Sequence, residues 1–112
     1  MINFGKKGRT MQDIIENKLN ELKKICSSLG VKRLYIFGSA VSGKFNKNSD
    51  IDLLISFDES LPFEQYTQNY FELHYKLREL FKREIDIVTE RSLSNPYLIE
   101  SIDETKKLIY EA

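Results

Sequence analysis

The sequence Tyr35-Ile36-Phe37-Gly38-Ser39 is followed, after ten residues, by Asp50-Ile51-Asp52-Leu53-Leu54-Ile55. Each apolar stretch is typical of a short buried strand, and the Gly-Ser pair ends the first one. Because side chains alternate between the two faces of a strand, Asp50 and Asp52 share one face and the isoleucines share the other. Like charges on one face repel each other. The pair therefore predicts a bound cation, and carboxylate oxygens suit Mg²⁺.

The composition indicates one small protein domain. The chain has 112 residues, with 17 Lys plus Arg and 17 Asp plus Glu. This balance gives no general attraction to nucleic acid or to a membrane, so we expect no direct nucleic-acid binding. No apolar run approaches the roughly 18 residues of a membrane span. The single cysteine, Cys26, excludes an internal disulfide and fits a cytoplasmic protein. We expect a flexible arm over 1–10 and one domain over 11–112.

Apolar periodicity predicts the order helix, strand, strand, helix, strand, helix. The expected helices cover 11–29, 63–83 and a last segment that begins at Asn95-Pro96. The expected strands cover 34–37, 50–57 and 84–89. Gly30 supplies a left-handed residue that ends the first helix. This order predicts an α/β or α+β fold, with a small mixed sheet of about three or four strands covered by helices.

Two helical stripes are expected to pack in the core rather than to bind a ligand. The first is largely aromatic and comprises Phe63, Tyr66, Tyr70, Phe71, His74, Leu77, Leu80 and Phe81. The second, in the last helix, comprises Leu98, Ile99, Ile102, Leu108 and Ile109. The only histidine and the only cysteine, His74 and Cys26, are too few for a zinc site. His74 is interpreted as a packing or surface residue, and Cys26, on an apolar helix face, as a core residue.

A third carboxylate, Asp86, lies on the predicted strand 84–89. If Ile85 and Ile87 pack on the helices that cover Ile51, Asp86 faces the same way as Asp50 and Asp52. Three such carboxylates can hold two Mg²⁺ ions about 4 Å apart, an arrangement used for in-line nucleotidyl displacement.

The loop between the two strands offers groups for a phosphate. Gly38 would let the backbone approach it closely, with amides and the Ser39 hydroxyl as donors.

Each part of this site also has a simpler interpretation. The Gly-Ser pair occurs in ordinary tight turns, and Asp-x-Asp occurs in turns that face solvent. Asp86 could pair with Lys82 or Arg83 at the surface. The combination at this spacing favours a nucleotide site over these separate explanations.

The segment Gly38-Ser39-x10-Asp50-x-Asp52, with Asp86 on a later strand, resembles the signature of the DNA polymerase β-type nucleotidyltransferase superfamily. From about Ile25 to the C-terminus the chain resembles the minimal nucleotidyltransferases (MNT) of bacteria and archaea. The resemblance includes the strand Asp86-Ile87-Val88-Thr89 and the helix start Asn95-Pro96-Tyr97. It implies that Asp50 and Asp52 bind both metal ions, and that Asp86 binds one and assists the attacking hydroxyl. It also implies that Gly38 and Ser39 contact the nucleotide phosphates.

One position departs from the family pattern. Many minimal members carry an arginine three places after the serine, where this chain has Ser42. An arginine would hold a phosphate with a forked cation, and Lys44 or Lys47 could replace it as a point charge. We count Gly38, Ser39, Ser42 and Lys44 as candidates for nucleotide binding. The resemblance implies ATP as the substrate and two Mg²⁺ ions as cofactors, with Mn²⁺ as another oxygen-binding option.

The resemblance implies transfer of AMP from ATP to a hydroxyl. With 112 residues there is little room for a domain that holds the acceptor, so we expect the acceptor to be a partner protein. In the family, such proteins pair with a helical HEPN toxin and act as antitoxins by adenylylating a toxin tyrosine. Two alternatives remain. One is a non-catalytic antitoxin that only binds its partner. The other is a transferase for a small-molecule hydroxyl, whose pocket would form in a homo-oligomer.

Overall fold

A computed structural model of the chain describes residues 11–38, 41 and 50–112. The elements follow in the order α1 (Met11–Asn17), α2 (Leu19–Ser28), β1 (Val31–Phe37), β2 (Ile51–Phe57), α4 (Phe63–Phe81), β3 (Ile85–Thr89), a 3-10 turn η1 (Glu90–Ser92), α5 (Pro96–Thr105) and β4 (Lys107–Glu111). The expected N-terminal arm, 1–10, lies outside the described residues. No helix within the described ranges is long and apolar enough to cross a membrane.

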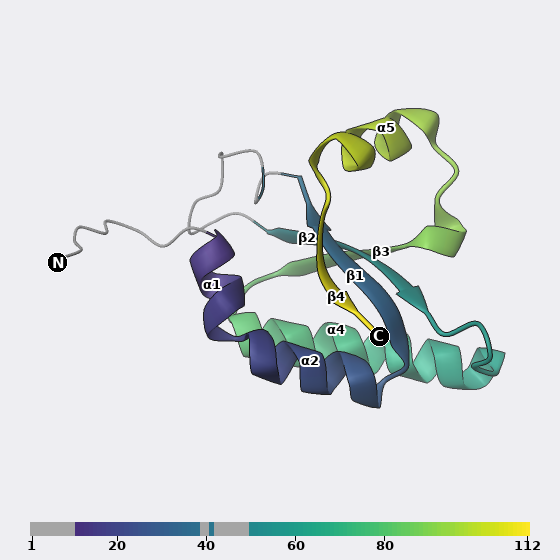
Figure 1. Cartoon of the computed structure of the whole chain (residues 1–112). Helices are drawn as coiled ribbons and strands as arrows, with labels where there is room; N and C mark the ends of the chain where they lie inside the picture. Colours follow the sequence, from purple (N-terminus) through teal and green to yellow (C-terminus); the bar gives the residue numbers. More distant parts are fainter. Residues whose placement is uncertain (1–10, 39–40, 42–49) are drawn as a thin grey trace, which may run out of the picture.

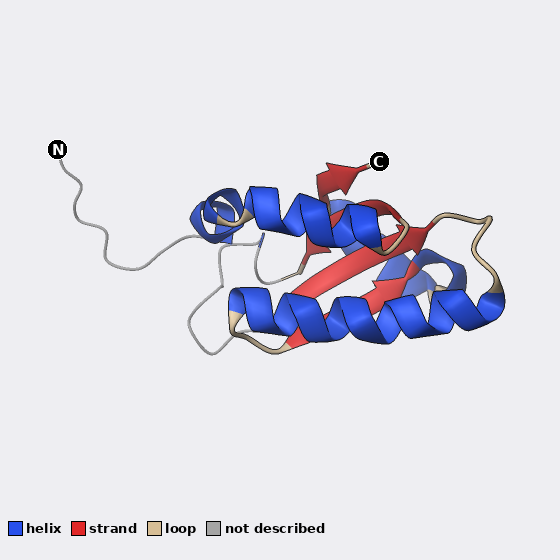
Figure 2. Ribbon diagram, turned by 90° about the horizontal axis from the view of Figure 1, so that it is seen from below, coloured by secondary structure: helices blue, strands red, loops and turns tan. Residues whose placement is uncertain are grey.

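The four strands form one mixed sheet in the order β3-β2-β1-β4. β1 pairs antiparallel with both β2 and β4, whereas β2 and β3 are parallel. Helices α2 and α4 lie side by side against one face of this sheet, and α5 lies on the other side (Figures 1 and 2). The predicted fold class, a small mixed sheet covered by helices, is confirmed.

Two apolar clusters lie on opposite faces of the sheet because β2 alternates its side chains. The larger cluster contains Ile51, Leu53 and Ile55, each fully buried, together with residues of α2 and α4. The predicted core position of Cys26 in α2 is confirmed. The smaller cluster consists of Phe37, Leu54 and Ile102, and it joins α5 to the end of β1 and the middle of β2. The face with the smaller cluster is the one that carries Asp52.

Two predicted helices have different bounds in the structure. The helix expected over 11–29 is interrupted at Lys18, whose φ and ψ are −115° and 12°. Ile15 of α1 and Leu22 of α2 are buried in the same cluster, so the two helices share one apolar face across this break. The helix expected to reach residue 83 ends at Phe81, where Lys82 adopts a left-handed conformation with φ 54°.

The last predicted helix is wrong beyond Thr105. Lys107–Glu111 form β4, which pairs with β1, so Leu108 and Ile109 do not belong to a helical stripe. Leu108 is 48% exposed. Leu108 and Ile109 fit the helical spacing of Ile99 and Ile102 by chance. A segment of five residues is too short for the alternation of a strand to stand out. β4 forms because it pairs with the edge of β1 that β2 leaves free, and this long-range contact cannot be read from the local sequence pattern.

The aromatic stripe of α4 is only partly in the core. The buried residues of this helix are Asn69, Leu73, Leu77 and Phe81, with Tyr66, Tyr70 and Leu80 packed beside them. The prediction is wrong for Phe63 and Phe71, which are 77% and 63% exposed. At 100° per residue, Phe71 lies about 160° around the helix from Leu73. Because α4 is rich in aromatic residues, its apolar stripe in the sequence is wider than the face of the helix that packs on the sheet.

Candidate active site

Two of the three predicted carboxylates stand next to each other on parallel strands. In the β2–β3 register Asp52 pairs with Asp86, and Ile51 pairs with Ile85. Both isoleucines are buried in the larger cluster under α2 and α4. Since neighbouring residues of a strand point to opposite faces, Asp52 and Asp86 share the face that α5 covers. The sheet therefore brings together two residues that are far apart in the sequence.

The environment of Asp52 disfavours its negative charge. The pKa of Asp52 is raised from 3.8 to about 6, chiefly by burial, then by the charges of Asp86 and Asp50 and by a side-chain hydrogen bond with Asp86. Asp50, the exposed residue just before β2, is thus within electrostatic reach of the pair. Local burial combined with two like charges is an arrangement typical of functional sites.

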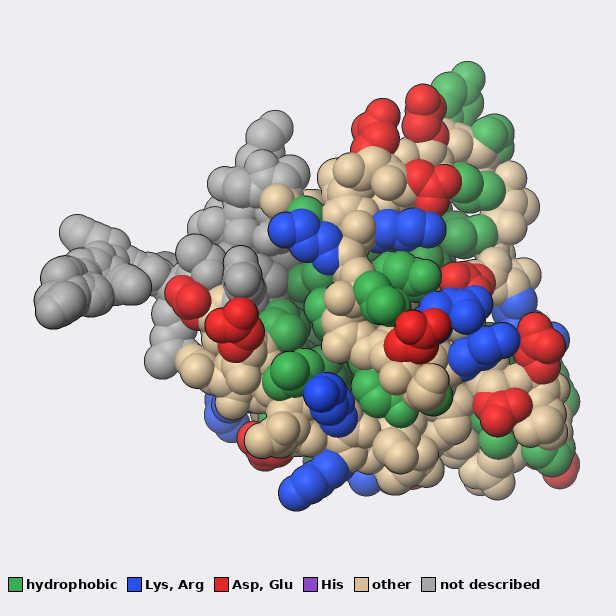
Figure 3. All heavy atoms as spheres, viewed as in Figure 1, with side chains coloured by type: hydrophobic (Ala, Val, Ile, Leu, Met, Phe, Trp, Pro, Cys, Tyr) green, Lys and Arg blue, Asp and Glu red, His purple; other side chains and the backbone are tan. Residues whose placement is uncertain are grey.

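Further acidic groups lie on the helix that covers this face. Glu100, Asp103 and Glu104 of α5 are exposed, and Figure 3 shows acidic side chains gathered over this helix. Lys106 pairs with Asp103 at 3.1 Å and lies 5.0 Å from the centre of the Tyr35 ring. Among the described residues, α5 therefore adds exposed acidic side chains, although the whole chain is neutral.

Gly38 is held directly against Asp52. Its φ is +78°, a conformation that a residue with a side chain rarely adopts. A Cβ atom at this position would lie 2.6 Å from Asp52 Oδ2, so the carboxylate occupies the space that a side chain would need. Gly38 O accepts a hydrogen bond from Val41 N at 3.0 Å, which forms a turn after β1. Glycine is required here for both its φ and its size.

Two positions near the site escaped the sequence reasoning. The Oγ1 of Thr105 accepts a hydrogen bond from Gly38 N at 3.1 Å. His74 Nε2 lies 2.7 Å from the carbonyl oxygen of Ile85 and donates to it, because a carbonyl only accepts. His74 thereby links α4 to the residue just before Asp86. Neither residue belongs to a recognisable motif, since each acts through one tertiary contact.

The donor set fits a divalent cation in its chemistry. All three side chains supply carboxylate oxygens, the ligands that Mg²⁺ prefers, and a cation would favour the ionised form of Asp52. Within the described ranges, no group of three or more His, Cys, Asp or Glu side chains is already arranged as a metal site. Ser39, Ser42 and Lys44, the other candidates for nucleotide binding, and Lys47 lie outside the described residues.

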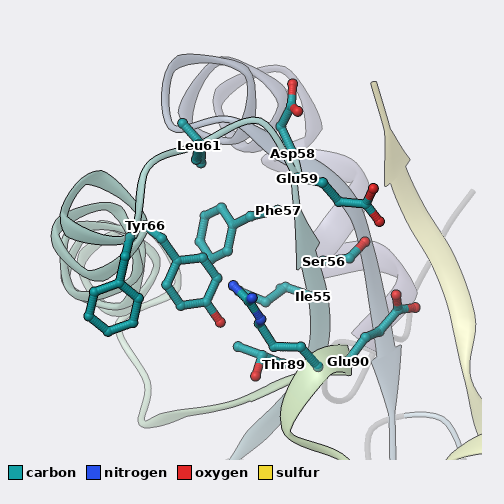
Figure 4. Close-up of a pocket in the computed structure, with 11 residues that line it drawn as sticks. Ile55, Ser56, Phe57, Asp58, Glu59, Leu61, Tyr66, Thr89 and Glu90 are labelled. Atoms are coloured by element: carbon teal, nitrogen blue, oxygen red, sulfur yellow. The ribbon is translucent and has the colours of Figure 1, made fainter.

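A separate cavity of about 510 Å³ lies at the opposite ends of β2 and β3. Figure 4 shows its lining, which includes Ile55, Phe57, Tyr66 and Thr89. The Arg91 guanidinium lies 4.8 Å from the centre of the Tyr66 ring, and Phe57 meets that ring edge-on at 5.1 Å. Asp52 and Asp86 stand at the N-terminal ends of these strands, so this cavity is not part of the carboxylate site.

Comparison with known proteins assigns the chain to a family. Residues 19–109 match the family model described as a nucleotidyltransferase domain. The chain belongs to the nucleotidyltransferase domain family. It is 32% identical over 102 residues to a protein of Methanocaldococcus jannaschii named "Putative protein adenylyltransferase", covering 91% of this chain and 98% of the relative.

Two solved structures resemble this nucleotidyltransferase. One, named as a putative minimal nucleotidyltransferase, has a TM-score of 0.69 and 25% identity, and the match covers 91% of this chain and 98% of that one. The other is a chain from the crystal structure of a toxin–antitoxin with AMP-PNP. It has a TM-score of 0.65 and 25% identity, with 84% of this chain and 73% of that chain covered. The resemblance to minimal nucleotidyltransferases and the assignment as an enzyme are confirmed.

Proposed function

We propose that this nucleotidyltransferase transfers AMP from ATP to a hydroxyl of a partner protein and thereby acts as an antitoxin. The observation that carries the proposal is the Asp52–Asp86 pair in the parallel β2–β3 register, with Asp50 close enough to raise the pKa of Asp52. The similarity to a protein named as an adenylyltransferase and to a toxin–antitoxin chain with AMP-PNP supports it.

The three carboxylates have distinct roles in this proposal. Asp50 and Asp52 would hold divalent cations through their oxygens, and Asp86 would hold one and accept the proton of the attacking hydroxyl. Cations bound there would neutralise phosphate charge and make the hydroxyl more acidic. Gly38 brings the end of β1 against Asp52, where a Cβ would approach Oδ2 to 2.6 Å, so glycine lets the backbone lie directly beside this carboxylate. The attacking oxygen bonds to the α-phosphorus of ATP, and pyrophosphate leaves.

The acceptor in this proposal is a tyrosine of a HEPN-type toxin. This identity comes from the family resemblance. The exposed aromatic residues of α4 support a protein partner: Phe71 and Tyr75, one helical turn apart, are 63% and 65% exposed. Large exposed apolar groups that lie together are typical of protein-binding surfaces.

Labelled ATP tests this function directly. The protein, Mg²⁺ and the product of the adjacent gene are incubated with ATP labelled at the α-phosphate. The neighbour should gain label and the mass of one AMP, and an Asp50→Ala/Asp52→Ala variant should transfer none. Glu21→Gln, which removes an exposed carboxylate on α2, is the matched control and should act as the wild type does. An unlabelled neighbour with the wild-type enzyme would contradict the proposal.

A non-catalytic partner-binding antitoxin is the second candidate. Ser42, in the place where many minimal nucleotidyltransferases carry an arginine, and the exposed aromatics of α4 favour it. In that case the Asp50→Ala/Asp52→Ala variant would still protect cells from the toxin, whereas Phe71→Ala/Tyr75→Ala would not. Transfer to a small-molecule hydroxyl would instead appear as labelled product when the protein alone is screened against small acceptors.

A further inference from the structure

The end of α5 is joined to the turn after β1 by a single side chain. The Thr105 Oγ1 accepts a hydrogen bond from the Gly38 N–H at 3.1 Å, across 67 residues of sequence. The hydroxyl proton of Thr105 points the other way, because it is donated to Ser101 O at 3.2 Å within the helix. A hydroxyl has one proton and two lone pairs, so these two bonds together fix its orientation.

The helix that carries Thr105 is anchored beside the site. Ile102, one turn before Thr105, is 1% exposed and packs with Phe37 and Leu54. Phe37 directly precedes Gly38 and pairs with Asp52 in the β1–β2 register. Leu54 lies two residues after Asp52 on the same face of β2. The contacts that bury Ile102 thus hold the end of α5 beside the end of β1, where the Thr105 hydroxyl meets Gly38 N.

Gly38 is confined from both sides. Thr105 holds its N–H, and the Asp52 carboxylate fills the space beside its Cα, where a Cβ would approach Oδ2 to 2.6 Å. Gly38, at φ +78°, is therefore held by a hydrogen bond at its N–H and by the Asp52 carboxylate, which lies beside its Cα. The Gly38 N–H is bonded to Thr105 in this arrangement, so Gly38 supports the site by its position and not as a donor to phosphate.

We propose that Thr105 is a positioning residue of the nucleotidyltransferase site. Its hydroxyl holds the Gly38 turn against Asp52, so that the backbone meeting the nucleotide phosphates keeps its place relative to the carboxylates. The inference rests on the proposed function, because it concerns binding of the nucleotide at the same site. Loss of one such bond is expected to weaken ATP binding more than it slows the chemical step, because the phosphates contact the turn before and during transfer.

Substitution of Thr105 tests the inference. Thr105→Val keeps the side-chain shape and removes the acceptor, whereas Thr105→Ser keeps the hydroxyl. Thr67→Val is the matched control, because the Thr67 hydroxyl donates to Phe63 O at 3.1 Å in α4, a helical bond of the same kind away from the site.

We expect Thr105→Val to raise the KM for ATP about tenfold, equivalent to ~1.4 kcal/mol, with kcat changed by less than about threefold. Thr105→Ser should restore KM to within about threefold of the wild-type value, and Thr67→Val should leave it unchanged.

Amide hydrogen exchange of Gly38, followed by NMR on the free protein, gives a readout that is independent of activity. Thr105→Val should speed this exchange about tenfold or more, and Thr67→Val should not. An unchanged KM together with unchanged Gly38 exchange would overturn the inference. So would a fall in melting temperature and kcat without a change in KM, because that result indicates only a loosened helix.

Failure of the proposed function would be recognised separately, since the wild-type protein would then transfer no AMP. The positioning role would in that case be decided by Gly38 exchange and by ATP affinity measured calorimetrically. Faster exchange together with weaker ATP binding in Thr105→Val would support it, and unchanged values would refute it.

Discussion

Replacing Asp52 by asparagine should make the protein more stable at neutral pH. Burial, the charges of Asp86 and Asp50 and a hydrogen bond with Asp86 raise the pKa of Asp52 from 3.8 to about 6. The ionised form of Asp52 is therefore less favourable in the folded chain than in the unfolded chain. Asparagine keeps the size of the side chain and its ability to donate to Asp86, as protonated Asp52 does, but it carries no charge.

The magnitude follows from the shift in pKa. A shift of about two units corresponds to roughly 3 kcal/mol at 1.36 kcal/mol per unit. Asp52 is partly exposed, and screening by solvent reduces the expected gain to about 1–2 kcal/mol. Because the folded pKa lies above the unfolded one, the folded state holds the extra proton between about pH 4 and pH 6. The wild type consequently loses stability as the pH rises through this window, and the advantage of the variant should vanish below about pH 4.

Denaturant unfolding of the two proteins at about pH 4 and pH 7.5 measures this difference. Asp58→Asn is the control with the opposite sign, because hydrogen bonds from Ser60 lower the pKa of the exposed Asp58 carboxyl. Millimolar Mg²⁺ should stabilise the wild type at neutral pH and leave Asp52→Asn unchanged, while the variant should lose AMP transfer. If Asp52→Asn were less stable than the wild type at neutral pH, or if its advantage did not shrink on acidification, burial and the neighbouring charges would not raise the pKa of Asp52 as inferred.

Three further substitutions or modifications have defined outcomes. Gly38→Ala should destabilise the fold by about 1–2 kcal/mol in denaturant unfolding, because its φ is +78°, and should lower AMP transfer about tenfold or more, because its Cβ would meet Asp52. Lys82→Gly should stabilise the protein by about 0.5–1 kcal/mol in the same assay, because Lys82 ends α4 in the left-handed conformation that glycine adopts without strain. Burial raises the pKa of the Cys26 thiol to about 12, so alkylation with iodoacetamide near pH 8 should be at least about 100-fold slower in the native protein than in urea. Fast labelling of the native chain would contradict the buried position.

The fold and the carboxylate pair could be predicted from local patterns because alternation in β2 and β3 sorts the residues between the two faces. Ile51 and Ile85 are apolar and pack on the helices, which leaves Asp52 and Asp86 together on the opposite face. The strand register that aligns them is a tertiary property, yet two short strands with the same alternation leave few other pairings. The metal-binding and catalytic roles of these residues stay predictions.

The features that sequence reasoning missed depend on long-range partners. β4 exists because β1 offers a free edge, and no pattern within Lys107–Glu111 encodes that edge. Thr105 is an ordinary residue at the end of a helix until the chain folds and brings Gly38 to its hydroxyl. Helical spacing placed Phe71 in a broad apolar stripe, and only the packing of α4 on the sheet shows that this residue lies outside the buried face. Local chemistry therefore predicted most of the elements and the acidic residues, whereas contacts between elements decided the existence of β4 and the contact between Thr105 and Gly38.

The two faces of the sheet differ in what they contribute: one carries most of the buried apolar residues, and the other carries the predicted site. The face under α2 and α4 holds most of the buried apolar residues, so it supplies the greater part of the burial that stabilises the chain. The other face has a cluster of only three buried residues among those described, Phe37, Leu54 and Ile102, beside carboxylates that repel each other. A fold that uses one face for stability can tolerate unfavourable negative charge on the other, and carboxylate charge is what attracts a divalent cation. The small cluster under α5 then has a second purpose, because the helix it anchors also carries the hydroxyl that holds Gly38 against Asp52.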